Sequence, residues 1–173
     1  RKWYYVITNF WLIPIPEHSL LSILFPYFNS VIHKIPIENI LFLDIETVPE
    51  YKSFQELPEH QQQLYTDKTA YQRKDEVSPE DFYHKAGIWA EFGKIVCISA
   101  GFITNRNGEN QIRITSFHGD EKSQLVEFTA LIQNHFNQSQ SLLCAHNGKE
   151  FDFPYIARRM LIHGMNLPDK LQL

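Results

Sequence analysis

The sequence predicts an α/β domain in which helices flank a mixed β-sheet and a helical insertion follows the first strand. Apolar strand-like segments alternate with helical ones in the order strand, helical insertion, strand, strand, helix, strand, helix. An Asn-Gly pair between the second and third strands predicts a tight hairpin, and therefore an antiparallel pair. With 173 residues, 43% of them hydrophobic, the chain is long enough to bury the core of one main domain.

The first strand is predicted at 41–47, where Asp44 and Glu46 interrupt an apolar run. Side chains two apart on a strand share one face, so these carboxylates should repel each other, more strongly if buried. A divalent cation between them would remove that repulsion, and the pattern therefore indicates half of a site for a hard metal ion. In the alternative interpretation the two acids mark a strand end that emerges into solvent, since Pro49 follows closely.

Residues 49–92 are polar and are predicted to form an insertion of helices and loops over one side of the core. One helix should begin at Ser78-Pro79, a capping hydroxyl followed by proline at the first helical position. The second strand is predicted at 94–103, covered on both sides, with Ile95, Cys97 and Ser99 on one face and Val96, Ile98 and Ala100 on the other. Asn107-Gly108 then turns the chain into a third strand at 111–117.

A helix capped by Asp120 should cover the sheet, because its apolar residues recur on one stripe: Leu125, Phe128, Ile132 and Phe136. A short strand is predicted at 141–145, followed by a loop at 146–149. The last helix should be opened by Pro154 and stopped near Gly164. Asp152, just before this helix, suits the positive end of its dipole, and it can also serve as a third carboxylate beside the sheet. The two roles are compatible.

Residues 1–36 differ from the remainder and are predicted to be an apolar appendage to a domain at 37–173. The runs Trp3 to Pro16 and Ser19 to Ile32 are free of charge, but each covers only about half to three quarters of a bilayer. We favour a loosely packed segment over a membrane anchor, and expect that removal of residues 1–33 leaves a folded, soluble protein without stable membrane association.

Net charge and cysteine content indicate how the protein can bind nucleic acid and in which compartment it resides. A net charge of −4 argues against a protein that coats nucleic acid by bulk positive charge, although not against an enzyme that grips one strand end. The two cysteines, Cys97 and Cys144, lie in apolar runs, far from any second Cys or His at metal-ligand spacing. Buried thiols in a reducing compartment, and thus a cytoplasmic protein, are expected.

Two motifs together resemble the DnaQ-like, or DEDD, family of 3′-to-5′ exonucleases within the ribonuclease H-like fold, most of all the exonuclease domain of family B DNA polymerases and stand-alone exonucleases of that type. The first motif is Leu43-Asp44-Ile45-Glu46-Thr47. The second is Asn147 with Phe151-Asp152-Phe153-Pro154. The resemblance covers about residues 37–173 and includes the segment Glu91 to Ser99.

This resemblance implies a two-metal phosphodiesterase that acts on the 3′ end of single-stranded DNA, with RNA possible. Asp44, Glu46 and Asp152 would be the catalytic ligands of two Mg²⁺ or Mn²⁺ ions, about 3.5 to 4 Å apart. Ile45, Thr47, Asn147 and Phe151 would contact substrate, Phe151 by packing against a base. Lys149, Arg158 and Arg159 are weaker candidates for phosphate contacts. A polymerase or repair partner is left open.

The sequence departs from the family pattern in one respect. A third motif, a Tyr or His four residues before a fourth Asp, does not occur after the second motif, and Asp169 has Met165 at that spacing. We therefore assign neither a fourth ligand nor a general base, and expect little activity from these 173 residues alone.

Two alternatives remain. A haloacid dehalogenase-like phosphohydrolase also places two acids after a hydrophobic strand, but its second acid is normally Asp, where this chain has Glu46. A non-catalytic nucleic-acid-binding or scaffolding module of the same fold would fit the missing motif. His146 is expected to bond a backbone carbonyl rather than to act in the site.

Overall fold

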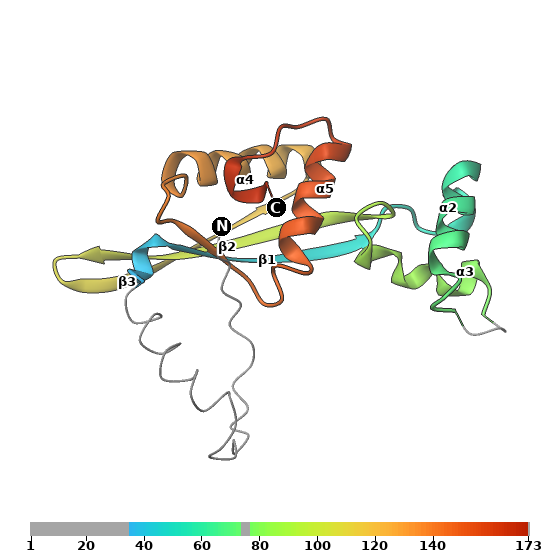
Figure 1. Cartoon of the computed structure of the whole chain (residues 1–173), viewed down its shortest axis with the longest axis horizontal. Helices are drawn as coiled ribbons and strands as arrows, with labels where there is room; N and C mark the ends of the chain where they lie inside the picture. The colour runs from blue at the N-terminus through green and yellow to red at the C-terminus, as the bar shows by residue number, and fades with distance from the viewer. Residues whose placement is uncertain (1–34, 74–76, 173) are drawn as a thin grey trace, which may run out of the picture.

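The computed structural model describes residues 35–73 and 77–172. Figure 1 shows a sheet with two long helices on one side and a smaller helical part past one end of the strands. The strands are β1 (Ile40–Pro49), β2 (Gly93–Arg106), β3 (Glu109–His118) and β4 (Leu142–Cys144). The helices are α2 (Glu59–Thr69), α3 (Pro79–Phe82), α4 (Glu121–His135) and α5 (Asp152–Ile162), with 3₁₀ turns at Ile37–Asn39, Phe54–Glu56, Tyr83–Ile88 and Asp169–Leu171.

The sheet is mixed, as predicted, with strand order β3-β2-β1-β4. β2 is antiparallel to both β1 and β3, while β4 is parallel to β1. The hairpin between β2 and β3 turns at Asn107 and Gly108, both at positive φ (55° and 84°). The predicted α/β class and the predicted element order are therefore confirmed.

Helices α4 and α5 pack on the same face of the sheet (Figure 1). This face carries Leu41, Leu43 and Ile45 of β1, all at most 6% exposed, within the main hydrophobic cluster. The other face carries Phe42, Asp44 and Glu46, and we call it the open face. Both acids are exposed there, so β1 is buried on one face only.

A β-bulge corrects the predicted faces of the second strand. Glu46 pairs with Cys97 but Thr47 pairs with Ile95, so Val96 is an extra residue in β2. The extra residue reverses the alternation, and Ile95 joins Ile98 in the core, each at most 1% exposed. Cys97 and Ser99 are only half-buried. Strict alternation was therefore wrong at this point.

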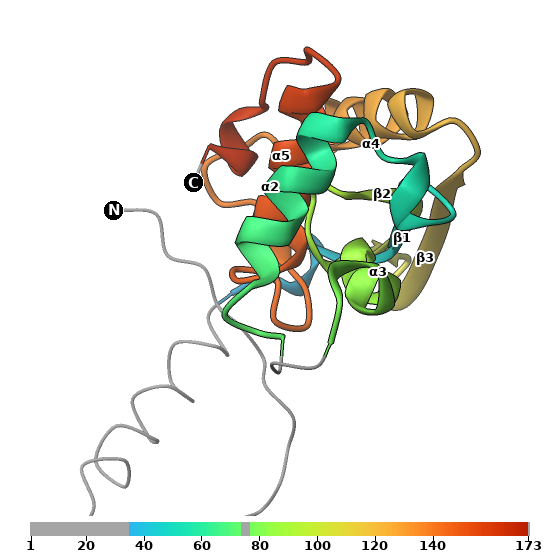
Figure 2. The same ribbon diagram turned by 90° about the vertical axis from the view of Figure 1, so that its right-hand side faces the viewer.

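The insertion consists of helices and turns, as predicted, but it does not lie over a face of the core. Figures 1 and 2 show α2 and α3 past the end of β1 and β2. The insertion has a hydrophobic cluster of its own, formed by Leu57, Tyr65, Phe82, Tyr83, Ala86 and Phe92. The rings of Tyr65 and Phe92 meet edge to face, with centroids 5.1 Å apart. The insertion is thus a satellite unit at the strand ends.

The predicted helix boundaries agree with the capping contacts. Asp120 accepts a hydrogen bond from the Ser123 amide at 2.9 Å, and Ser78 accepts one from the Asp81 amide at 3.1 Å. Helix α5 begins at Asp152, two residues before Pro154, and Gly164 follows it at φ 68°.

Candidate functional site

The two carboxylates of β1 lie in solvent, not in the interior. Asp44 and Glu46 alternate with the buried Leu43 and Ile45, so both point to the open face. The expectation that burial forces a cation between them is therefore wrong. β1 continues to Pro49, so the acids do not mark a strand end, but the solvent exposure expected in the alternative interpretation is confirmed.

Asp152 occupies the place where strand pairing stops. β4 pairs with β1 only from Ile40 to Phe42, which leaves the next part of that edge of β1 without a strand. There the Asp152 Oδ1 accepts a hydrogen bond from the Ile45 amide at 3.3 Å. The carboxylate is 2% exposed and lies past the carboxyl end of β4, where α/β folds commonly place ligand sites.

The charge of Asp152 is disfavoured by its surroundings. Burial raises the pKa of Asp152, and the negative charge of Asp44 raises it further. Its own backbone amide, the Ile45 amide and His146 act in the opposite direction without cancelling the effect. The fold thus brings Asp44 and Asp152 close enough to repel each other, in a position where a cation would relieve the repulsion.

The loop between β4 and α5 is shaped by Asn147 and Gly148. Asn147 has φ 55°, a left-handed conformation that Asn tolerates, and its carbonyl accepts from the amides of Glu150 and Phe151, each at 3.0 Å. A Cβ at Gly148 would lie 2.6 Å from the Ala145 Cβ and 2.7 Å from the Phe153 ring. These two residues set the direction in which the chain enters α5, and therefore the position of Asp152.

The predicted substrate-contacting residues differ in accessibility. Asn147 is exposed beside the site, whereas the Ile45 side chain is in the core at 6% exposure. Thr47 and Phe151 are half-buried, and the Phe151 ring lies against Tyr155 with centroids 5.4 Å apart. Asn147 and Phe151 both precede Asp152, in the segment that leads into α5.

A hollow of about 330 Å³ lies beside these acids, between β1 and the end of β4. It is lined by Phe42, Leu43, Asp44, Cys144, Ala145 and His146. The exposed His146 shows no hydrogen bond to any described residue, so the predicted bond to a backbone carbonyl is not found among them. His146 was not predicted from the sequence to act in the site. Its position directly after a strand that is parallel to β1 was the available signal.

The donor chemistry of this site fits a hard divalent cation, because carboxylate oxygens are the ligands that Mg²⁺ and Mn²⁺ prefer. The arrangement is not that of a ready-formed cage. Within residues 35–73 and 77–172, no group of three or more His, Cys, Asp or Glu side chains is gathered closely enough to hold an ion. Asp44 and Asp152 are brought together, and Glu46 shares the open face with Asp44.

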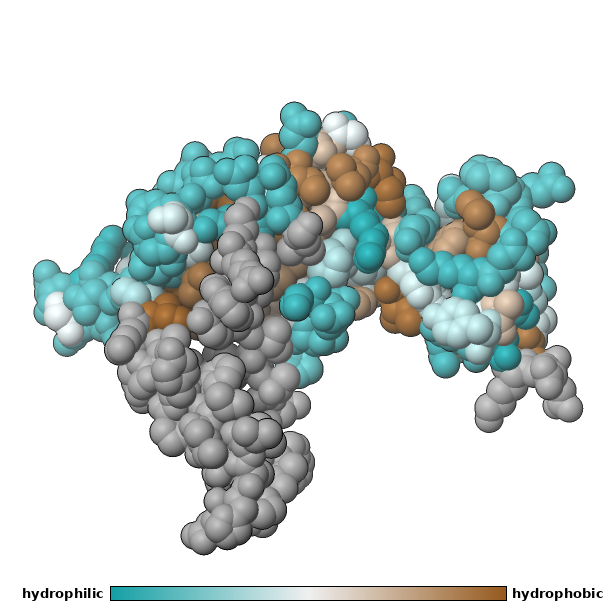
Figure 3. All heavy atoms as spheres, viewed as in Figure 1, coloured by the Kyte–Doolittle hydropathy of each residue, from teal (hydrophilic) through white to brown (hydrophobic). Residues whose placement is uncertain are grey.

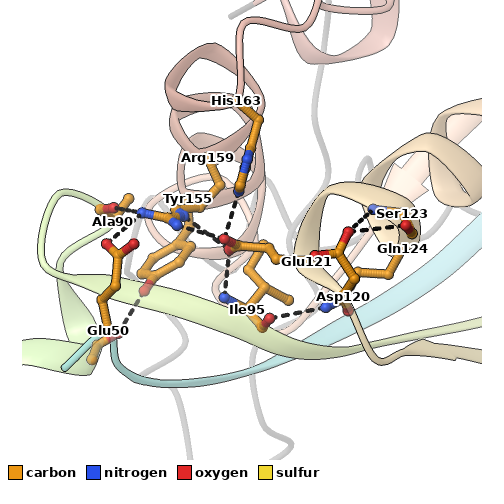
Figure 4. A network of polar contacts seen from close by, with 11 residues as sticks. Glu50, Ala90, Ile95, Asp120, Glu121, Ser123, Gln124, Tyr155, Arg159 and His163 are labelled. Atoms are coloured by element: carbon orange, nitrogen blue, oxygen red, sulfur yellow. Dashed lines mark hydrogen bonds and ion pairs between the residues drawn. The ribbon is translucent and has the colours of Figure 1, made fainter. Parts of the chain in front are cut away.

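Arg159 does not reach the surface, so it cannot make the phosphate contact suggested by the sequence. It is 1% exposed and bonds Glu121, with Nε 2.8 Å from Oε1. Figure 4 shows the network around this pair, in which Glu121 also contacts His163 and the Ile95 amide. The other two candidates for phosphate contacts, Lys149 and Arg158, are exposed.

Comparison of the chain with protein-family models, with curated proteins and with solved structures gave no match. In the described part of the chain, each helix is too short or too polar to cross a lipid bilayer. The apolar runs before residue 35, and the two interpretations given for them, lie outside the described residues.

Proposed function

We propose that the chain is a metal-dependent 3′-to-5′ exonuclease domain with a ribonuclease H-like fold, acting on single-stranded DNA ends. The observation that carries the proposal is the placement of Asp152. This nearly inaccessible carboxylate is held against the backbone of β1, beside Asp44, although both burial and repulsion raise its pKa. Burial and repulsion of this carboxylate cost stability, and a bound cation would offset that cost.

Asp44, Glu46 and Asp152 would hold the Mg²⁺ or Mn²⁺ ions. Bound ions supply positive charge to the reacting phosphodiester and to the attacking water. Asn147 offers an exposed amide next to this site, and Phe151 offers part of a ring face to the terminal nucleotide. The strand order, with β2 antiparallel to its neighbours and β4 parallel to β1, is compatible with the proposed fold.

Metal binding is the direct test, because three of the four expected carboxylates are assigned here. We expect isothermal titration calorimetry to detect Mn²⁺ binding by the 173-residue chain. Asp44→Ala and Asp152→Asn should each weaken binding at least about ten-fold, as expected for loss of a ligand or of its support. Glu109→Gln, at the exposed hairpin of β3, is the matched control and should bind like the wild type.

The competing function is a non-catalytic nucleic-acid-binding module of the same fold. Incubation with a 5′-labelled single-stranded oligonucleotide distinguishes the two functions. Mn²⁺ affinity that does not depend on Asp44, together with unchanged binding of the strand, would establish the module and overturn the exonuclease. Trimming from the 3′ end that disappears in Asp44→Ala would establish the exonuclease. A phosphoryl group trapped on Asp44 would instead indicate a phosphohydrolase.

A further inference from the structure

A second hollow, of about 440 Å³, lies at the far end of β1, between that strand and the turn Phe54–Glu56 of the insertion. Val48, Tyr51, Lys52 and Lys94 line it, together with the acids Glu50 and Glu56. It is separate from the hollow beside Asp44, with which it shares no residue.

The hollow opens on the same side of the sheet as the proposed metal site. Asp44, Glu46 and Val48 alternate along β1 and share the open face, and Lys94 pairs directly with Val48 across the strands. Val48 lies four residues beyond Asp44, a separation of about 13 Å along a strand. A nucleic-acid strand whose 3′ end is held at Asp44 must therefore extend beyond its first phosphate to reach Lys94.

The two lysines in this hollow form no ion pair among the described residues, whereas one of the two acids, Glu50, is paired with Arg159. Among the described residues, no carboxylate lies within 4 Å of the ammonium of Lys52 or of Lys94. Glu50 contacts the Arg159 guanidinium at 3.4 Å, and Glu56 accepts a hydrogen bond from the Lys52 backbone amide at 3.3 Å. The hollow thus holds two lysines that are free of ion pairs among the described residues, beside Glu50, which pairs with Arg159, and Glu56, which has no cationic partner there.

We propose that Lys52 and Lys94 bind backbone phosphates of a nucleic-acid strand upstream of the 3′ end held at Asp44 and Asp152. The half-buried ring of Tyr51 adds a flat apolar surface for a base. This assignment rests on the proposed function. It sets the direction of the bound nucleic acid along the open face, with its 3′ end at Asp44 and its upstream nucleotides at Lys94.

The test measures binding of a fluorescein-labelled ten-residue oligothymidylate by anisotropy, with phosphorothioate linkages that slow cleavage. Lys52→Ala combined with Lys94→Ala should raise the Kd about ten-fold at low salt. It should also lower the slope of log K against log salt by about 1.4, which is about 0.7 for each lost phosphate contact. Lys52→Arg combined with Lys94→Arg should retain the wild-type Kd. Lys122→Ala, an exposed lysine on α4, is the control and should change neither quantity.

Ligand length and ligand type decide between a strand site and a simple anion site. A dithymidylate should bind the wild type and the double alanine variant equally, because it cannot reach both sites. Inorganic phosphate that competes as well as the ten-residue strand, or a double variant with unchanged affinity and salt slope, would overturn the assignment. Failure of the metal titration alone would remove the 3′ end from Asp44 but leave the measured lysine contacts intact, so the failures of the two proposals are distinguishable.

Discussion

At the scale of single residues, Glu121 and Arg159 form the most consequential polar pair described. Arg159 is 1% exposed and donates to Glu121 from Nε, while Glu121 also accepts from the Ile95 amide and contacts His163 (Figure 4). Burial alone would raise the pKa of Glu121, but the hydrogen bonds from Arg159, His163 and Ile95 outweigh it and hold this pKa below its usual value of 4.5. The pair therefore joins α4, α5 and β2 through one ionised carboxylate.

Glu121→Gln should destabilise the protein by about 3 kcal/mol at pH 7, because it leaves the Arg159 guanidinium buried without its anion. A carboxyl whose pKa is lowered by folding contributes stability above its unfolded pKa, and loses it as the pH falls through the folded value. The difference from wild type should therefore be full at pH 7 and shrink below pH 4.5. Urea unfolding at pH 7 and at about pH 3.5 measures both values of the free energy.

Glu127→Gln, on the exposed side of α4, is the matched control and should change the free energy of unfolding by no more than about 0.5 kcal/mol. If the cost of Glu121→Gln were as large at pH 3.5 as at pH 7, ionisation of Glu121 would not be its source.

The residues of the candidate site were easier to identify from the sequence than their environments. Asp44, Glu46 and Asp152 stand out as acids beside apolar runs, and the structure brings Asp152 to Asp44. Burial of Asp44 was predicted wrongly, because the sequence does not show which face of β1 the helices cover. Arg159 was predicted as a phosphate contact because its partner Glu121 lies 38 residues away in the chain.

At the scale of elements, the junction between β4 and α5 determines where Asp152 lies. Gly148 leaves no room for a methyl group, since Ala145 and Phe153 are already within 2.7 Å of its Cβ position. Phe153 also donates its amide to the Gly148 carbonyl at 2.8 Å. The loop, the first turn of α5 and the strand end are therefore packed as one piece.

Gly148→Ala should destabilise the protein by about 1 to 3 kcal/mol, the usual cost of overpacking, because Phe153 must move to admit the methyl group. That movement would displace the neighbouring Asp152, so Mn²⁺ affinity should fall as well. Thermal unfolding and calorimetry measure the two effects. Gly101→Ala is the control, since its Cβ would meet other atoms only at 3.7 Å. Unchanged stability of Gly148→Ala would show that the loop adapts and does not position Asp152.

The strands and helices were predicted to within a few residues, because hydrophobic periodicity and capping residues are local signals. The bulge at Val96 was not predicted, since it depends on the register between β1 and β2 rather than on either strand alone. Residues 49–92 were correctly predicted as helical, but not placed at the strand ends. Their position follows from the aromatic cluster around Tyr65, whose members are spread along the insertion.

At the scale of the whole molecule, the described residues form two hydrophobic clusters, and Figure 3 shows hydrophobic surface on both the main part and the insertion. The main cluster extends from Leu41 to Leu171, and the cluster of the insertion extends from Leu57 to Phe92. The buried hydrogen bond from the Tyr155 hydroxyl to the Gly87 carbonyl, at 2.8 Å, connects α5 with the insertion. These contacts together should make the sheet, the two long helices and the insertion unfold as a single cooperative unit.

A chain that begins at residue 34 should consequently be folded and soluble, with a Tm within about 4 °C of the 173-residue chain, a difference of about 1 kcal/mol for this size. Its Mn²⁺ and oligonucleotide affinities should be unchanged, because Asp44, Asp152, Lys52 and Lys94 all lie within the two clustered units. Circular dichroism melting and analytical ultracentrifugation test the fold and the association state. Aggregation, or a broad transition without a baseline, would mean that residues before 34 complete the core.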